Sequence, residues 1–397
     1  MELHFDFANE DYESYLSFVR KEKISLSCPV VHIAGSNGKS SVAQLLFSLY
    51  LASGYKVGLF LNTYYSSAEE MILVNGKSVD AARVEAKMKE YAKPFDKFGL
   101  SDFQKIFVIA CCLFGEEKLD LAIIETGMGG AMDATNIPYK DKALSIITNI
   151  SLEHTEILGT TLSQIAYEKA GILVEGVPVL FGELDESCKE TLIDASLTSS
   201  CPIHNADQAH NIAFDGSGFH FIYGGREDLY LPRLSQFDVK NASVALEAVS
   251  LLKERFPFKE ETINQALAIK PLRGHMEAHG DILFDGAENA YAMNGLALTL
   301  PAFAAGKKVH VIFASKRGQN IAVELPLIDN HTDGITLTTF EGEDVRNEDD
   351  YFLYAPDYEY IPSFKEALAS LNERFPEDKI LVTGCLEFVY ACLKEVA

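Results

Sequence analysis

Residues 30–41 read VVHIAGSNGKSS, and this stretch decides the fold. An apolar run from Pro29 to Ala34 leads into a loop that contains Gly35 and Gly38. From Lys39 to Ser53 the apolar residues recur at the spacing of an amphipathic helix. This order of strand, glycine-rich loop and helix predicts the first unit of an α/β domain with a parallel sheet.

The same alternation of short apolar runs and helical patterns continues along the chain. Further strands of this sheet are expected at Lys56–Leu61, Leu119–Glu125, Ala143–Ile150 and Val177–Phe181. The segment Asp207–Leu234 combines glycines with aromatic residues, which predicts antiparallel hairpins inserted in the same domain. A helical pattern returns at Asp238–Phe256. The sequence therefore predicts a first domain over residues 1–270.

A second alternating series follows Pro271. Its strands are expected at Asp281–Phe284, Lys308–Phe313, Gly334–Leu337, Tyr351–Tyr354 and Lys379–Thr383. This series predicts a smaller, Rossmann-like α/β domain over residues 271–397. Two α/β domains in one chain suit an enzyme that joins two substrates.

Length, charge and cysteine content exclude several classes of protein. The 397 residues exceed the roughly 100 to 200 of a typical domain, which agrees with two domains. With 34 Lys and Arg against 58 Asp and Glu, the net charge of −24 disfavours nucleic acid and anionic membranes as partners. The 7 cysteines form no CxxC pair, so we expect buried thiols rather than a disulfide framework or a zinc site. The start, MELHFDFANEDYES, lacks the pattern of a signal peptide, which predicts a cytoplasmic protein.

The loop has the composition of a phosphate-binding loop. Its residues are Gly35, Ser36, Asn37, Gly38, Lys39, Ser40 and Ser41. Glycines let backbone N–H groups approach a polyphosphate, a lysine neutralises its charge, and a hydroxyl can hold Mg²⁺. The loop is shorter than the general P-loop, and a glycine-rich turn with an incidental lysine is the alternative.

This loop and two later segments resemble the folylpolyglutamate synthase and dihydrofolate synthase family of the Mur ligase superfamily. The family loop usually reads GTNGKGS. The other matching segments are LDLAIIETGMGGAMDATN and ITNISLEHTEILGTTLSQIAYEKAGIL. The resemblance is dense over residues 30–180 and thin elsewhere. It implies an ATP-binding P-loop domain of the Mur ligase central type, with a Mur ligase-type α/β domain after it.

The resemblance also assigns metal ligands. It implies that Ser41, Asn62, Glu125 and His154 hold Mg²⁺, with Asn62 in place of a serine. Glu125 ends a predicted strand at the carboxyl edge of the sheet, where ligands of α/β sheets bind. From spacing alone, Glu125 fits a solvated strand-end acid equally well, and a lone histidine is more often structural than a ligand.

Four more positions take roles from the family pattern. The resemblance implies a carbamylated lysine at Lys169, whereas its position alone fits an ordinary lysine at a helix end. It places Asp133 and Asn136 of the DATN segment at the acid substrate. It also places Asn241 at the nucleotide, although a surface residue or a helix cap explains Asn241 equally well.

The second domain departs from the family pattern. PLRGHME replaces the usual PGRxE, so Arg273 becomes the candidate nucleotide contact, with His275 beside it. The DGAHNP motif keeps Asp285 as a candidate catalytic residue but carries Glu288 in place of histidine. Ala131 likewise replaces an arginine of the first domain. An anion at residue 288 would repel the carboxylate of an incoming amino acid.

The resemblance implies an ATP- and Mg²⁺-dependent ligase that acts as a monomer. Lys39, Lys169, His154 and Asp285 are then its candidate catalytic residues. The enzyme would convert a carboxylate of a folate or another acid to an acyl phosphate, which an amino acid attacks. Two alternatives stay open, a nucleotide-binding pseudoenzyme and a Mur-type ligase with a non-folate substrate.

Overall fold

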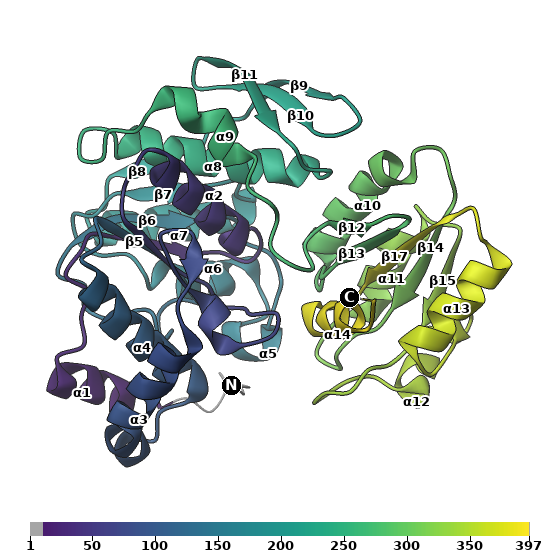
Figure 1. Cartoon of the computed structure of the whole chain (residues 1–397), viewed down its shortest axis with the longest axis horizontal. Coiled ribbons are helices and arrows are strands. Elements are labelled where there is room, and N and C mark those ends of the chain that lie inside the picture. The colour runs from purple at the N-terminus through teal and green to yellow at the C-terminus, as the bar shows by residue number, and fades with distance from the viewer. Residues whose placement is uncertain (1–10, 397) are drawn as a thin grey trace. The chain divides into compact units, whose positions relative to one another are not determined.

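The computed structural model describes residues 11–396, which fall into two compact units (Figure 1). The first unit contains the described chain up to Ile212, together with His220–Leu231 and Val239–Ile269. The second contains Ala213–Phe219, Pro232–Asp238 and the chain from Lys270 onward. The first ten residues, which begin the segment examined for a signal peptide, lie outside the described residues. Among the residues described, no helix has the length and apolar character needed to cross a membrane.

The first unit is built on an eight-stranded sheet with the order β4-β3-β2-β5-β1-β6-β7-β8. The strands are β1 (Val30–Ala34), β2 (Val57–Phe60), β3 (Ile72–Val74), β4 (Lys77–Ser78), β5 (Leu121–Glu125), β6 (Lys142–Ile147), β7 (Val179–Phe181) and β8 (Ile203–Asn205). The six strands β2, β5, β1, β6, β7 and β8, in this order across the sheet, pair in parallel. β3 and β4 continue the sheet beyond β2 as an antiparallel edge. The central strands are buried along their whole length, which agrees with their mostly apolar sequences. The predicted parallel sheet is confirmed.

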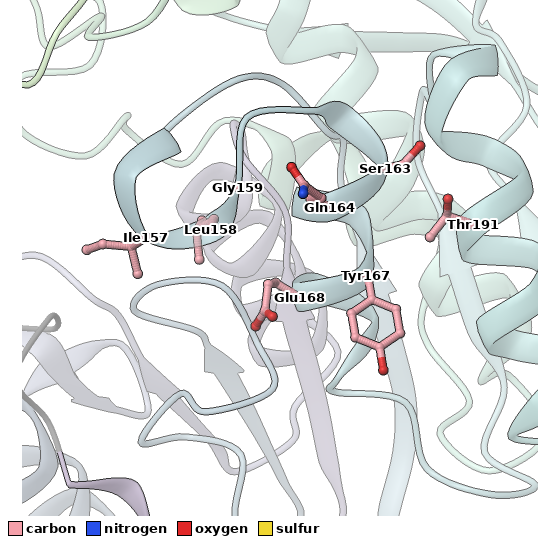
Figure 2. A pocket seen from close by; sticks show the side chains of 8 residues that line it. All are labelled: Ile157, Leu158, Gly159, Ser163, Gln164, Tyr167, Glu168 and Thr191. Atoms are coloured by element: carbon pink, nitrogen blue, oxygen red, sulfur yellow. The ribbon is translucent and has the colours of Figure 1, made fainter.

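Helices cover this sheet and connect its strands (Figure 1). They are α1 (Tyr12–Glu22), α2 (Lys39–Ala52), α3 (Ala81–Phe98), α4 (Asp102–Glu117), α5 (Thr155–Leu158), α6 (Leu162–Ala170) and α7 (Glu186–Thr198), with a 3₁₀ turn, η2, at Ala68–Met71. A pocket of about 380 Å³ lies where α5, α6 and α7 meet (Figure 2). Its lining includes Ile157, Gln164, Tyr167 and Thr191. No sequence pattern predicted this pocket, because it depends on how three helices pack.

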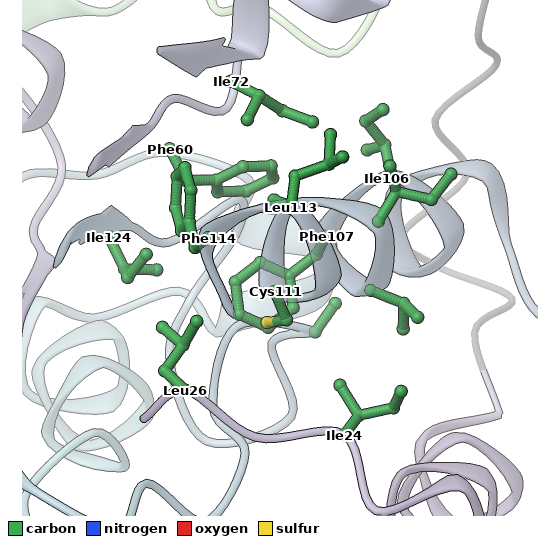
Figure 3. Close-up of a cluster of buried hydrophobic side chains, with 14 of the residues drawn as sticks. Ile24, Leu26, Phe60, Ile72, Ile106, Phe107, Cys111, Leu113, Phe114 and Ile124 are labelled. Atoms are coloured by element: carbon green, nitrogen blue, oxygen red, sulfur yellow. The ribbon is translucent and has the colours of Figure 1, made fainter. Parts of the chain in front are cut away.

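A cluster of buried apolar side chains packs α4 against the sheet (Figure 3). Phe60 of β2 contacts Phe107 of α4, with ring centroids 5.1 Å apart. Each fully buried phenylalanine contributes about 1.5–3 kcal/mol to folding. Ile124 of β5 faces this cluster, so the next residue, Glu125, points to the opposite face of the sheet. The core thereby fixes the direction of the acid at the strand end.

The chain after β8 forms a small sheet and two helices. The sheet has the order β11-β10-β9, with β9 (His210–Phe214), β10 (Phe219–Tyr223) and β11 (Arg226–Leu231). The helices are α8 (Gln236–Leu251) and α9 (Ile263–Leu267), with a 3₁₀ turn, η3, at Glu260–Thr262. Strands are therefore present where the glycine and aromatic pattern predicted hairpins, and a helix is present where Asp238–Phe256 predicted one.

The second unit has a six-stranded sheet with the order β12-β13-β17-β14-β15-β16. Its strands are β12 (Glu277–His279), β13 (Ile282–Asp285), β14 (Val309–Phe313), β15 (Gly334–Leu337), β16 (Glu359–Tyr360) and β17 (Lys379–Thr383). All pairings are parallel except that of β12 with β13. The helices are α10 (Ala290–Ala304), α11 (Ile321–Asp329), α12 (Glu348–Phe352), α13 (Phe364–Arg374) and α14 (Leu386–Val396). The predicted second α/β domain has the expected architecture.

The strand predicted at Tyr351–Tyr354 is wrong, because this run ends helix α12. Asn347 caps the helix, and a reciprocal bond with Asp350 completes the cap. Tyr351 is buried, and its hydroxyl accepts the N–H of Ser315 at 2.8 Å. The apolar run was too short to separate a strand from a helix, and the cap decides between them.

Candidate functional site

The phosphate loop, Gly35 to Ser41, connects β1 to α2 at the carboxyl edge of the first sheet. Gly35 has φ +145°, and a Cβ there would lie 1.9 Å from Oγ1 of Thr148. Gly38 has φ +79°, and a Cβ there would lie 2.3 Å from Oδ1 of Asn241. Only glycine fits at either position, so the loop lies close to the end of β6 and to α8. The predicted nucleotide contact Asn241 is thus brought to the loop.

Residues that follow β6 hold the loop in place. Asn149 accepts the N–H of Asn37 on its Oδ1 at 2.8 Å, and its carbonyl accepts the N–H of Ser36. Ser151 binds the side chain of Asn37 at 2.9 Å. The sequence analysis missed Asn149 and Ser151. Their signal was available, since both follow a predicted strand whose end meets the same edge of the sheet.

Lys39 lies in the first turn of α2 and reaches back over the loop. Its Nζ donates to the carbonyl oxygens of Gly35 at 2.9 Å and Ser36 at 3.1 Å. The positive charge therefore lies beside the N-terminus of α2, where the backbone N–H groups favour an anion.

Glu125 is fully buried at the end of β5. Its carboxylate accepts the hydroxyl of Ser40 at 2.6 Å and the N–H of Asn62 at 3.2 Å. Burial raises the pKa of Glu125 to about 7, and the charge of Lys39 opposes this shift. Ser40, rather than the predicted ligand Ser41, contacts the acid, while Ser41 is half-buried in the first turn of α2. The family loop has glycine where this chain has Ser40.

The oxygen atoms at this edge fit a small, hard cation. Oδ1 of Asn62 is buried and has no hydrogen-bond partner in the described chain, although Nδ2 of Asn62 donates to Gly127. Over residues 11–396, no three His, Cys, Asp or Glu side chains form a group that could hold a metal ion. A single carboxylate with hydroxyl and amide oxygens suits Mg²⁺, which keeps several waters and binds phosphate oxygens. The predicted ligands Glu125 and Asn62 are adjacent, which fits this ion.

Lys169 is buried near the C-terminal end of α6, with 1% of its surface exposed. Its Nζ lies 2.6 Å from Oε1 of Glu153 and 2.9 Å from the carbonyl of Gly35. Burial lowers the pKa of Lys169, and Glu153 opposes this shift. Although burial alone would raise the pKa of Glu153, the charges of Lys169 and Lys39, together with the hydrogen bond from Lys169, lower it to about 2. The sequence analysis missed Glu153, which directly precedes the exposed His154.

Asp133 and Asn136 hold the segment that follows β5. Asp133 is buried and accepts the N–H groups of Gly127, Met128 and Thr135. Nδ2 of Asn136 donates to the carbonyls of Ala131 at 3.1 Å and Gly171 at 3.0 Å. Both side chains therefore shape the loop beside Glu125, and their predicted contact with the acid substrate stays a prediction.

The remaining predicted residues belong to the second unit. Asp285 ends β13 and accepts the N–H groups of Met276 at 2.9 Å and Ala287 at 3.0 Å. Burial raises the pKa of Asp285 to about 7. Nε of Arg273 pairs with Glu277 at 2.9 Å, and Glu288 is exposed. Within this unit, Arg273 lies on the turn before β12, and Asp285 ends β13, which pairs with β12.

The chain is similar to several known proteins. Residues 33–249 match the Mur ligase middle domain. The folylpolyglutamate synthase of Lacticaseibacillus casei is 25% identical over 375 residues, covering 90% of this chain and 87% of the relative. The dihydrofolate synthase/folylpolyglutamate synthase of Bacillus subtilis is 26% identical over 389 residues, covering 90% and 88%. The solved structure of E. coli FolC in complex with DHPP and ADP has a TM-score of 0.87 at 24% identity, covering 100% of this chain and 95% of that one. The chain therefore belongs to the Mur ligase family, in the branch of folylpolyglutamate synthases and dihydrofolate synthases.

Proposed function

We propose that this protein is an ATP-dependent ligase that joins a folate-type acid to an amino acid through an amide bond. The observation that carries this proposal is the set of contacts at the edge of the first sheet. Lys39 lies on the phosphate loop, Ser40 links that loop to Glu125, and Lys169 contacts the loop at Gly35. The relatives that match most of the chain are named for this activity.

The first half of the reaction activates the acid. The loop N–H groups and Lys39 bind the polyphosphate of ATP and neutralise charge as the terminal phosphoryl group moves. Glu125, Asn62, Ser41 and His154 are the proposed holders of Mg²⁺, which supplies further positive charge at the phosphates when bound. The oxygen of the carboxylate is a poor leaving group, and its phosphorylation provides a good one. The product of this half is an acyl phosphate and ADP.

The second half joins the amino acid. Its amine attacks the acyl carbon, and the tetrahedral intermediate expels phosphate. Water must be excluded, since it would hydrolyse the acyl phosphate. Lys169, carbamylated as the resemblance implies, would place an anion beside the cations of the loop. Related solved structures include one with Mn, AMPPNP and L-glutamate bound and one with AMPPCP and folate. We propose glutamate as the amino acid and a folate or dihydropteroate as the acid.

We further propose that the enzyme acts as a monomer in the cytoplasm, with no nucleic acid partner. The net charge of −24 supports the last point, because phosphate backbones repel an acidic protein. Asp285 and Arg273 would act from the second unit, on the reaction and on the nucleotide respectively.

Turnover of ATP tests the proposal directly. Purified protein is mixed with ATP, Mg²⁺, one acid and one amino acid, and the release of ADP and phosphate is measured. The acids are dihydropteroate, folate and reduced folates, and the amino acids include glutamate and aspartate. We expect release only when an acid and an amino acid are both present. Tight binding of ATP without release in any combination would overturn the proposal and favour a pseudoenzyme.

A further inference from the structure

A line of four buried polar side chains runs through the first unit beneath the site. Nζ of Lys142 lies 3.1 Å from Nδ1 of His32, and Nε2 of His32 lies 2.9 Å from Oγ1 of Thr135. The hydroxyl of Thr135 binds Oδ1 of Asp133. The exposed fractions are 9% for Lys142, 3% for Asp133 and 0% for the two residues between them. We call these four residues the buried relay.

Burying four polar side chains in an apolar core costs free energy, so their presence there calls for a physical explanation. Lys142 and His32 lie on the neighbouring strands β6 and β1, and Tyr139 packs edge-on against the His32 ring. A buried lysine or histidine opposes folding unless its polar atoms are satisfied. Each atom of the relay has a partner, so the four groups stabilise one another as a network.

The bonds of the relay all have the same direction. Asp133 accepts three backbone N–H groups, which suits a carboxylate, so the hydroxyl of Thr135 donates to it. Oγ1 of Thr135 then accepts from Nε2–H of His32. A neutral imidazole has only one N–H, so Nδ1 of His32 accepts from Lys142. Burial lowers the pKa of His32 well below its usual range, and the charge of Lys142 lowers it further. The donors therefore point from the amino group of Lys142, whose pKa burial lowers to about 7, to the carboxylate of Asp133.

The two ends of the relay reach two different parts of the site. At one end, Asp133 holds the N–H groups of Gly127 and Met128, which closely follow Glu125. At the other end, Nζ of Lys142 donates to the carbonyl of Ile172, just beyond the helix that carries Lys169. The relay thus ties together the two segments that place Glu125 and Lys169.

We propose that Lys142, His32 and Thr135 are positioning residues that act through Asp133 and Ile172 to hold Glu125 and Lys169 in their working geometry. The inference rests on the proposed function for its catalytic readout. None of these three residues is among those proposed to contact the nucleotide, the acid or the metal. A group that hydrogen-bonds a metal ligand directly is worth about 10- to 100-fold in affinity or activity. The three positioning residues act through a further contact, so the low end of that range is expected.

Thr135 offers the sharpest test, since two substitutions separate its hydroxyl from its shape. Thr135→Val keeps the volume and removes the bond, whereas Thr135→Ser keeps the bond. We expect Thr135→Val to lower kcat about 10-fold, the low end of the range for groups that support a metal ligand, and Thr135→Ser to restore most of that loss. The matched control is Ser196→Ala, which removes another fully buried hydroxyl, on α7, that donates to Leu192 at 2.7 Å. Wild-type kcat in Thr135→Val, or equal losses in both Thr135 variants, would overturn the proposal.

The tautomer of His32 gives a readout that does not depend on activity. Nitrogen-15 NMR of labelled protein at pH 7 distinguishes Nε2–H from Nδ1–H and from the imidazolium form. We expect a neutral ring with Nε2–H, and an altered Nδ1 shift in Lys142→Met. A ring with Nδ1–H, or a protonated ring, would overturn the relay. Binding of Mn²⁺ with ADP to Thr135→Val, measured by calorimetry, should be weaker than to Ser196→Ala.

These readouts separate the relay from the proposed function. If the wild-type chain joins no acid to any amino acid, the proposed function fails, and the His32 tautomer and Mn²⁺ binding still decide on the relay. If the wild-type chain is an active ligase and Thr135→Val matches it in kcat and Mn²⁺ binding, only the relay fails.

Discussion

The two parallel sheets hold the acids at their carboxyl edges in different ways. Glu125 of the first sheet accepts bonds from Ser40 and Asn62, which are distant in the sequence. Asp285 of the second sheet accepts bonds from Met276 and Ala287, which lie within its own turn and the preceding hairpin. The first edge is therefore assembled by tertiary packing, and the second by local backbone.

This difference predicts where substitutions have wide effects. At the first edge, side chains from distant segments contact one another. The loss of one of them therefore disturbs the phosphate loop, Glu125 and Lys169 together. At the second edge, an acid held by its own turn keeps its place when neighbouring side chains change. The family motif is altered here at Glu288, which is exposed. We therefore expect the largest functional losses in the first unit and mainly changes of stability or substrate affinity in the second.

The largest expected effect is that of Lys39→Met. The substitution keeps most of the side-chain length but removes the charge beside the N-terminus of α2. We expect kcat for ADP release to fall about 10²- to 10³-fold, the usual loss when one donor to the reacting group is removed. The control is Lys189→Met, an exposed lysine on α7 that pairs with Glu186. Similar turnover by Lys39→Met and Lys189→Met would contradict a catalytic phosphate loop.

In the second unit, Glu324→Gln should change stability in a way that depends on pH. Glu324 is buried, and burial raises its pKa to about 7, against opposing effects of the Asn320 backbone and Arg346. Because the native state holds the proton more tightly than the unfolded chain, Glu324 costs stability as pH rises from about 4.5 to 7. Glutamine avoids this cost, so the variant should gain up to about 2–3 kcal/mol on the wild type between pH 4 and pH 8.

Urea unfolding at several pH values measures this gain. The control, Glu377→Gln, changes an exposed acid after α13 and should follow the wild type at every pH. A constant difference between Glu324→Gln and the wild type across the range would show that Glu324 titrates as an ordinary carboxyl group.

At the edge of the first sheet, the sequence predicted the strands and the loop better than it predicted the contacts between side chains. Hydrophobic periodicity and glycine positions are local signals, and they predict where strands end, where the loop lies and in which order the elements follow. The role of Ser40 and the pair formed by Lys169 and Glu153 depend on packing between distant segments. A pattern that places a residue at a sheet edge does not say which neighbour its side chain meets.

The error at Tyr351–Tyr354 has the opposite origin. There the deciding signal was local, since Asn347 is followed by three acids in the first turn of α12. The apolar run that followed suggested a strand, and a four-residue run has no period that separates strand from helix.

The buried relay could not be predicted from the sequence for a third reason. His32 and Lys142 stand within apolar strands, and only the pairing of β1 with β6 brings them together.

At the edge of the first sheet, substitutions of Ser40 and Ser41 should change the affinity for Mn²⁺ in opposite directions. The hydroxyl of Ser40 donates to Glu125 and so competes with a cation for the same oxygen, whereas Ser41 is the predicted ligand. We expect Ser40→Ala to tighten Mn²⁺ binding in the presence of ADP about 3- to 10-fold, because one hydrogen bond is worth about 0.5–1.5 kcal/mol. Ser41→Ala should weaken it. Electron paramagnetic resonance of free Mn²⁺ measures both, and weaker binding in both variants would make Ser40 a ligand as well.

The smallest expected effect is that of Glu288→His, which restores the residue of the family motif in the second unit. An exposed anion repels the carboxylate of the incoming amino acid only weakly, because water and salt screen the charge. We expect KM for the amino acid to fall about 2- to 5-fold, as exposed charge pairs contribute about 0.2–1 kcal/mol, with KM for ATP unchanged. The control is Glu373→His, an exposed acid on α13. If Glu288→His lowers KM more than 50-fold, the second edge recognises the amino acid as strongly as the first edge binds phosphate, and the contrast between the two edges is lost.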